Sequence, residues 1–274
     1  MMNLKILTSA VKQIQSIVFV FLVQLGLGYI IYNYASKYFN LAFGKSELIN
    51  TFKNGFDRTV FSDLTHNTQE LMYYFGKEVM ILVVVYFFLS IFLHAGFIGN
   101  IVNENTSIKS YFKNALKLFL PYLGYVILFL IIYFLITIIL WYPYTTIFNG
   151  YPFSYFDSEK PIVIIGALLL FIQFILTIIV WGLSILTRMT FVKTKSFLQS
   201  IKDGITLLKK NILKIVLIGI VLLLIHIFLF ALSRWLTDLT LTNFVGYLVI
   251  TQGFVLLRIF IRVLSYQIFN DKLF

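Results

Sequence analysis

Six long apolar stretches constrain this 274-residue chain more than any other feature. A helix that crosses the hydrocarbon layer of a bilayer, roughly 30 Å thick, needs about 20 apolar residues at 1.5 Å each. The stretches that meet this requirement are Ile14 to Ala35, Val79 to Val102, Leu116 to Trp141, Pro161 to Thr187, Ile212 to Trp235 and Phe244 to Phe269. They lack the alternation of barrel strands, and an unpaired backbone amide in lipid costs several kcal/mol, so each is expected to be a helix.

Composition excludes the main soluble classes. Hydrophobic residues make up 60% of the chain and charged residues 12%, and the mean hydropathy is +0.92. A soluble domain carries roughly 25% charged and about 45 to 50% apolar residues, which excludes a soluble enzyme, a disordered chain and a coiled coil. We expect an all-α polytopic membrane protein with six transmembrane helices, in which residues 1–274 form a single integral membrane domain.

The formal net charge of +11 raises nucleic-acid binding as a hypothesis. The basic residues stand in short segments between apolar stretches, however, and not in one soluble patch. This distribution favours cytoplasmic loops and anionic lipid headgroups as the cause, so membrane lipids are the expected partners and nucleic acid is not. The chain has no cysteine, which excludes disulfides, thiolate catalysis and cysteine-ligated metals.

The distribution of lysine and arginine predicts the orientation of the spans. Lys5 and Lys12 precede a first apolar stretch that continues for about 20 residues without a small-residue cleavage site, which predicts an uncleaved helix. With a cytoplasmic N-terminus, 15 of the 22 Lys and Arg residues fall on the inner side and seven on the outer side. Both termini are therefore expected in the cytoplasm.

Amphipathic stretches lead directly into the first, third and fifth spans, with lysines on their other faces. Their apolar residues are Leu4, Leu7, Val11 and Ile14, then Ile108, Phe112, Leu116 and Phe119, then Leu198, Ile201, Ile205, Leu208 and Ile212. The triplet Ser107-Ile108-Lys109 recurs as Ser200-Ile201-Lys202. These patterns predict three cytoplasmic interfacial helices and three helical hairpins in tandem. Apolar residues every four positions from Leu48 to Leu64 also predict short surface helices in the first outer loop.

Catalytic and metal-binding groups are scarce within the spans. No Asp or Glu lies inside an apolar stretch, which argues against a proton-coupled transporter and a carboxylate-dependent intramembrane enzyme. His66, His94 and His226 lie in different segments and lack the i, i+4 spacing of a zinc site. We therefore expect no catalytic residue, no bound metal and no cofactor.

Basic residues stand near the predicted cytoplasmic ends of the even-numbered spans. They are His94, Arg188 and Arg258, with Arg262 one turn beyond Arg258. One interpretation is an inner-leaflet pocket that binds a phosphate, a lipid headgroup or an anionic solute. The other is that these are ordinary positive-inside residues whose side chains extend to the interface.

Uncharged polar residues and glycines also occur within the spans. Gln24, Gln173, His226 and Gln252 either line a polar pathway or make interhelical hydrogen bonds worth on the order of 0.6 kcal/mol each. The span glycines predict close helix contacts. They are Gly26, Gly28, Gly96, Gly99, Gly182, Gly219, Gly246 and Gly253.

Three segments carry a family resemblance: Ser107 to Leu116, Arg188 to Asn211, and Leu257 to Arg262. With the order of the spans, they resemble the YciC-like group of bacterial inner-membrane proteins and the related six-span membrane domain fused to some glycerophosphodiester phosphodiesterases. The resemblance covers nearly the whole chain. It implies a multi-pass location in the bacterial inner membrane and transfers no catalytic residues.

Three functional hypotheses follow. The leading one is a non-enzymatic accessory or organising component that interacts with anionic lipid or a partner membrane protein. The alternative is a transporter or channel for a lipid or small anionic solute that uses the region of His94, Arg188 and Arg258. An intramembrane enzyme is the least favoured, because no nucleophile and base form an obvious pair.

Overall fold

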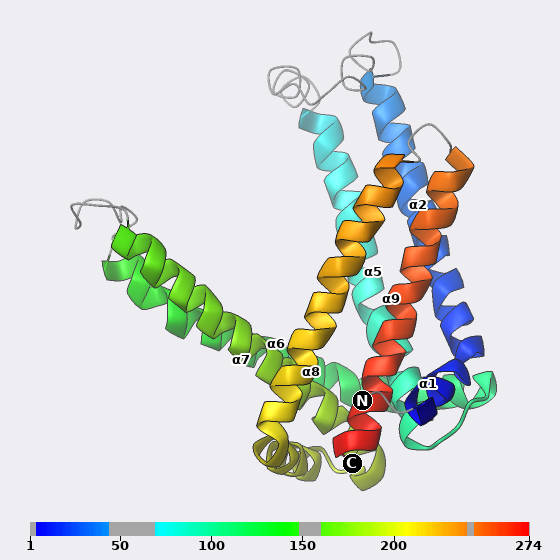
Figure 1. Ribbon diagram of the computed structural model, residues 1–274. Helices are drawn as coiled ribbons and strands as arrows, with labels where there is room; N and C mark the ends of the chain where they lie inside the picture. The colour runs from blue at the N-terminus through cyan, green and yellow to red at the C-terminus, as the bar shows by residue number, and fades with distance from the viewer. Residues whose placement is uncertain (1–3, 44–68, 148–159, 240–243, 274) are drawn as a thin grey trace. The chain divides into compact units, whose positions relative to one another are not determined.

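The computed structural model describes residues 4–43, 69–147, 160–239 and 244–273, and all regular secondary structure in these ranges is helical (Figure 1). The helices are α1 (Leu4–Val11), α2 (Ile14–Phe43), α5 (Gln69–Val102), α6 (Ile108–Ile147), α7 (Lys160–Thr194), α8 (Phe197–Leu239) and α9 (Phe244–Leu273). All except α1 are long and apolar enough to cross a membrane. The six predicted spans are thus confirmed, and the chain is an all-α, multi-pass membrane protein.

Several helices extend beyond the predicted spans. The amphipathic stretches before the third and fifth spans are the first turns of α6 and α8, whereas α1 is a separate helix. The prediction of interfacial helices therefore stays a prediction for the start of α6, which continues into its span, and for the start of α8, where the helical geometry is interrupted at Asn211 between the stretch and the span. Helix α6 runs through Pro121 and Pro143. Helix α8, which at 43 residues would be about 65 Å long if straight, is only kinked, at Asn211.

The predicted surface helices between Leu48 and Leu64 lie outside the described residues.

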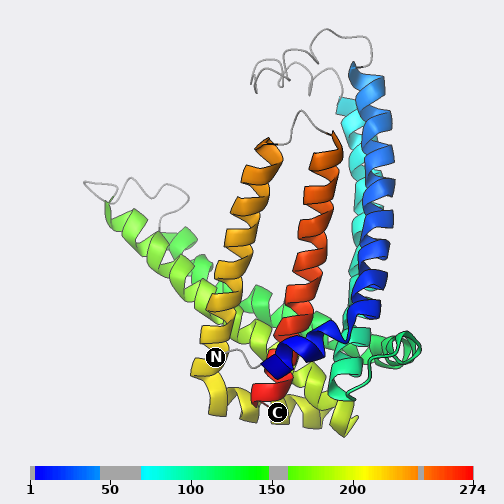
Figure 2. The same cartoon turned by 45° about the vertical axis from the view of Figure 1, so that its right-hand side comes forward.

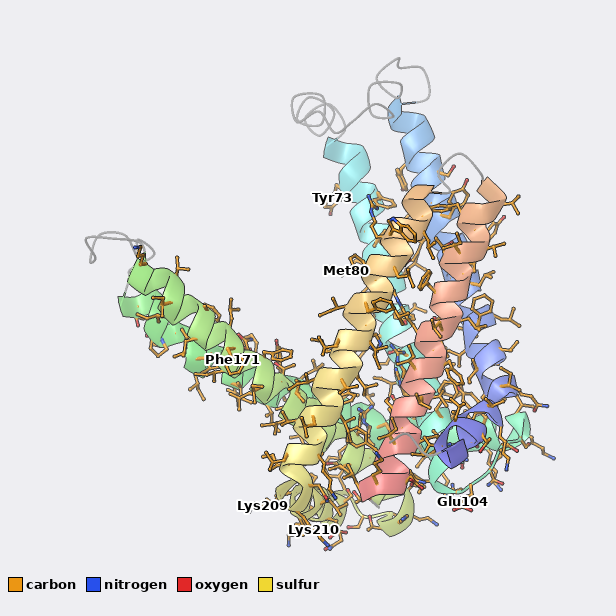
Figure 3. The ribbon with its side chains drawn as sticks, in the orientation of Figure 1. Tyr73, Met80, Glu104, Phe171, Lys209 and Lys210 are labelled. Atoms are coloured by element: carbon orange, nitrogen blue, oxygen red, sulfur yellow. The ribbon has the colours of Figure 1, made fainter. Side chains whose placement is uncertain are left out.

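The chain divides into two compact units, residues 18–90 and residues 1–17 with 91–274. In the smaller unit α2 and α5 lie side by side, joined by a hydrogen bond from Gln24 to the hydroxyl of Tyr86 and by an edge-to-face contact of Tyr38 with Phe75. Large side chains such as Met80 and Tyr73 remain exposed, as expected for lipid-facing positions (Figure 3).

In the larger unit, α6 lies beside α7 and α8 beside α9 in both views (Figures 1 and 2). The beginnings of α6 and α8, the ends of α7 and α9, and α1 gather at one end of this unit. Lys209 and Lys210 lie there beside the bend of α8, and Glu104 lies at the same end but away from that bend (Figure 3). We call the region formed by these helix ends the basic end, after its exposed lysines: Lys113, Lys117, Lys202, Lys209, Lys210 and Lys214.

Two glycines allow α7 and α8 to pack closely. A Cβ atom at Gly182 would lie 2.4 Å from Cγ2 of Ile215, and one at Gly219 would lie 2.3 Å from Cγ2 of Ile178. Each helix thus offers one isoleucine and one glycine, four residues apart, to the other helix. Isoleucine is stiff at χ1, so its Cγ2 methyl cannot easily move aside. Close approach of this kind is the usual source of helix association in lipid.

The glycine prediction is confirmed for these two positions and for Gly96 and Gly99, where an added Cβ would meet Tyr111 and Asn114 at 2.6 Å. At three other positions, no described atom lies within 4 Å of an added Cβ, so the structure shows no close helix contact there: Gly26, Gly28 and Gly253. A small side chain permits a close contact but does not require one.

Two turns at the basic end contain a residue in the same left-handed backbone conformation. Glu104 after α5 and Lys195 after α7 both have φ of 54°, a left-handed conformation uncommon for residues other than glycine. Ser107 caps α6, since its hydroxyl accepts a hydrogen bond from the amide of Ser110 at 3.4 Å. Ser200 instead lies inside the first turn of α8, which begins at Phe197. The two Ser-Ile-Lys triplets therefore do not occupy equivalent positions.

A buried amide network joins α5, α6 and the N-terminal segment. Asn114 donates to Oδ1 of Asn100 at 2.9 Å, and Asn100 donates to the carbonyl of Ser107 at 3.3 Å and to Gln13 at 3.5 Å. Gln13 in turn donates to the carbonyl of Asn105 at 2.6 Å. Asn100 is fully buried and Gln13 is 2% exposed, so this network must satisfy most of its own hydrogen-bonding groups.

Candidate functional site

The basic residues predicted to lie near one another come from α5, α7 and α9 of the larger unit. The structure brings His94 and Arg262 into direct contact, with Nη1 of Arg262 3.3 Å from Nε2 of His94. The other ring nitrogen of His94, Nδ1, lies 2.6 Å from the hydroxyl of Tyr266. Arg262 and Tyr266 are four residues apart on α9, which places them on one face of the helix. The half-buried imidazole of His94 bridges this pair.

The bond from Arg262 fixes the hydrogen positions in this group. A guanidinium has only donors, so Nε2 of His94 must be the acceptor. In the neutral ring the hydrogen then stands on Nδ1, which donates to the oxygen of Tyr266. Tyr266 is 4% exposed, and its own O–H hydrogen has no acceptor among the residues that the structure describes.

Arg188 enters the same region from α7. Its Nε donates to the carbonyl of Ser184 and its Nη2 to the Ser184 hydroxyl, both at 2.9 Å. The hydroxyl of the fully buried Tyr122 donates to the backbone carbonyl of Arg188 at 2.9 Å. The charges of Arg188 and Arg262 both act on His94 and Tyr266. Arg262 therefore contacts His94 directly, and Arg188 lies near enough for its charge to act on His94 and Tyr266.

Arg258 does not join this group. Its side chain is exposed and makes no hydrogen bond or ion pair with any described residue. It does share a face of α9 with Arg262 and Tyr266, because the three repeat every four residues.

Sequence reasoning missed Tyr266, Tyr122 and Ser184. The i, i+4 spacing from Arg262 to Tyr266 and from Ser184 to Arg188 was the available signal. In a chain with 17 tyrosines, a tyrosine one turn from an arginine does not stand out.

The residues considered for a polar pathway have different hydrogen-bonding surroundings in the structure. Gln24 is bonded to Tyr86 in the smaller unit. Gln173 accepts a hydrogen bond from the Trp141 indole and donates to Thr137 at 3.2 Å, which ties α7 to α6. The Nδ1 atom of His226 lies 2.7 Å from the carbonyl of Leu222 in its own helix. Gln252 has no hydrogen-bond partner among the described residues.

The site offers hydrogen-bond donors without balancing acid groups. No described carboxylate pairs with Arg188 or Arg262, and no three described His, Asp or Glu side chains are grouped as they would be to hold a metal ion. The chemistry that suits two guanidinium groups and a spare hydroxyl donor is recognition of an oxyanion.

Comparison of the chain with protein-family models, curated proteins and solved structures finds no match. The geometry of the basic end therefore carries the functional argument.

Proposed function

We propose that the protein is a non-enzymatic accessory or organising component of the bacterial inner membrane that interacts with anionic lipid at its basic end. In this proposal both termini and the basic end face the cytoplasm, whose membrane leaflet carries the negative surface potential that attracts lysine and arginine. The likeness to the YciC-like group agrees with this location.

The observation that carries the proposal is a pair of contrasting stripes, one buried and one exposed, on each segment entering the basic end. The buried residues repeat at helical spacing: Ile6, Ala10, Gln13 and Ile17, then Tyr111, Ala115, Leu118 and Tyr122, then Ser200, Gly204 and Leu208. These stripes pack inside the protein. The apolar residues singled out in the sequence lie mostly on the other side and are exposed.

The exposed side of each segment combines apolar residues with lysines. On α6, Leu116 is 72% exposed and stands between the exposed Lys113 and Lys117. On α8, Leu198 is 73% and Leu213 is 77% exposed, within a region that holds four exposed lysines: Lys202, Lys209, Lys210 and Lys214. A helix face with this mixture lies in the plane of a bilayer interface, its apolar residues among acyl chains and its lysines near the headgroups.

The kink in α8 suits such a placement. Asn211 departs from helical geometry, with φ of −126° and ψ of 21°, and its side chain donates to the carbonyl of Leu207 at 3.2 Å. Residues 197–211 thereby run in a different direction from the apolar span that follows, as Figure 2 shows. The bend separates an interfacial segment from a crossing segment, which a straight helix about twice as long as the hydrocarbon layer could not do.

The orientation can be tested by topology reporters. A reporter fused after Phe274 should read cytoplasmic, and one inserted at Tyr151 should read external, because 15 of the 22 basic residues then lie on the inner side. Two reporters are used at each position, one active only in the cytoplasm and one active only outside it, so that either orientation gives a positive signal. Reversal of either readout would overturn the cytoplasmic placement.

The lipid interaction can be tested by neutralising the lysines of α8. Changing Lys202, Lys209, Lys210 and Lys214 together to Gln should lower the enrichment of phosphatidylglycerol over phosphatidylcholine around the reconstituted protein at least five-fold, since a single lysine near an anionic surface is already worth about 1 kcal/mol. The readout is mass spectrometry of lipids that co-purify from mixed vesicles. Enrichment should weaken further with salt.

The matched control neutralises three exposed lysines elsewhere, Lys37, Lys77 and Lys160. This variant should keep the enrichment of the parent protein. Equal enrichment in the parent, the α8 variant and the control would contradict the proposal, as would a stoichiometric protein partner whose removal abolishes the enrichment.

A further inference from the structure

We propose that Arg188, Arg262 and Tyr266 form a discrete binding site for one phosphate group. This proposal rests on the proposed function, because it names the ligand chemistry of the basic end. It differs from general attraction to an anionic leaflet, since it requires a fixed set of donors and a stoichiometric ligand.

The first argument is the number of hydrogen-bond donors left over. Arg262 uses one N–H on His94, and Arg188 uses two on Ser184, out of five on each guanidinium. The hydroxyl of Tyr266 accepts from His94, so its own hydrogen remains to be donated. Only 4% of Tyr266 is exposed, and no described residue offers an acceptor to the hydrogen of its hydroxyl. A buried donor without an acceptor costs free energy that a ligand oxygen would recover.

The second argument is charge. Arg262 contacts His94, the charge of Arg188 also acts on His94 and Tyr266, and no described carboxylate pairs with either arginine. Like charges gathered without counterions are costly in a medium of low dielectric constant. A phosphate oxyanion would neutralise both and matches the planar donor geometry of arginine.

The third argument is position. Arg188 lies about 9 Å from the end of α7, and His94 about 12 Å from the end of α5, at 1.5 Å per residue. Arg262 lies deeper, about 17 Å from the end of α9, so the site extends from the headgroup boundary into the inner part of the hydrocarbon layer. Arg262 is exposed and Arg188 half-buried, whereas Tyr266 is buried. Arg262 is thus open to a ligand and Arg188 is partly open, whereas the Tyr266 hydroxyl that contacts His94 is covered.

The same chemistry fits a phospholipid headgroup and a soluble phosphate compound, so the experiment uses both probes. The purified full-length protein is exchanged into detergent with phosphatidylglycerol or phosphatidylcholine, and retained lipid is counted by native mass spectrometry. The parent protein should retain one phosphatidylglycerol under conditions that strip bulk lipid. Arg262→Gln and Tyr266→Phe should each reduce its occupancy about ten-fold, as expected for loss of one hydrogen bond to a charged group.

Matched controls lie on the same helix. Lys272→Gln removes an exposed charge, and Tyr247→Phe removes a hydroxyl that makes no side-chain hydrogen bond with a described residue. Both should retain the lipid. Tyr266→Phe keeps the buried ring, and its unfolding temperature reports whether the fold is intact. All of these variants keep the α8 lysines. If Arg262→Gln and Tyr266→Phe retain the lipid as the parent does, while enrichment still depends on the α8 lysines, this inference is overturned and the proposed function is not.

Inorganic phosphate distinguishes the two sources. If millimolar phosphate displaces the retained lipid from the parent protein, and raises its unfolding temperature but not that of Arg262→Gln, the site takes soluble phosphate as well as lipid phosphate. If phosphate has no effect while phosphatidylglycerol is retained, the ligand is a lipid headgroup. Unchanged retention in both Arg262→Gln and Tyr266→Phe, or absence of any effect of either probe, would overturn the site.

Discussion

Gly219→Leu should destabilise the protein by about 3 kcal/mol, the upper part of the range for overpacked cores. A Cβ at this position already lies 2.3 Å from Cγ2 of Ile178, and the rest of a leucine side chain must enter the same space. The α7 and α8 backbones would have to separate, which also loosens the contact of Gly182 with Ile215. The free energy of unfolding in mixed micelles, followed by loss of helical circular dichroism, measures the effect.

Gly253→Leu is the control for this prediction, because an added Cβ there meets no atom within 4 Å. It should change the free energy of unfolding little. A double-mutant cycle of Gly219→Ala with Ile178→Ala provides a second check. Gly219→Ala should lower the free energy of unfolding when Ile178 is present and lower it much less when residue 178 is alanine, with a coupling energy of about 1 to 2 kcal/mol. Additive effects would show that the two helices do not meet at this point.

The spans were predictable from the sequence because the length of a membrane crossing is set by the bilayer. Their ends were not, because the helix continues wherever nothing breaks it. Pro121 marks the point where the amphipathic part of α6 gives way to the apolar part, yet the helix passes through it. In α8 the equivalent point is Asn211, which has no strong helix-breaking character and still bends the chain.

The direction in which an apolar stripe faces was harder to predict. Leu116 on α6 and Leu198 on α8 each belong to the apolar face of an amphipathic stretch. In a membrane protein, however, an apolar residue faces either lipid or protein. The buried stripe of α6 instead includes Tyr111 and Ala115, whose polarity and size give little sign of burial. Tyr111 is buried in close contact with Gly96, and the neighbouring Leu118 and Asn114 pack against Gly99, both of which lie on another helix.

The candidate site was predictable in part. Its charged members stand out in the sequence because ionisable groups are costly in lipid. The separation of Arg258 from Arg262 could not be predicted, since both lie on one face and only the reach of His94 distinguishes them. Tyr266 was missed for a similar reason, because its role follows from a contact with a helix more than 170 residues earlier in the chain.

Asn100→Leu should have the second large effect, a loss of about 3 kcal/mol in the free energy of unfolding. Asn100 accepts from Asn114 at 2.9 Å and donates to the carbonyl of Ser107 at 3.3 Å, at a fully buried position. Leucine has nearly the same size but leaves these partners unsatisfied, and each buried unsatisfied group costs about 1 to 3 kcal/mol. The same unfolding titration gives the value.

Asn103→Leu provides the matched control, because Asn103 is exposed and its side chain bonds to no described residue. It should be nearly neutral. Adding Asn114→Leu to Asn100→Leu should cost less than the sum of the two single changes, because one unsatisfied donor disappears with its partner. A double variant that loses the full sum would mean that Asn100 acts through its volume, and that the amide network does not hold the α5–α6 turn in place.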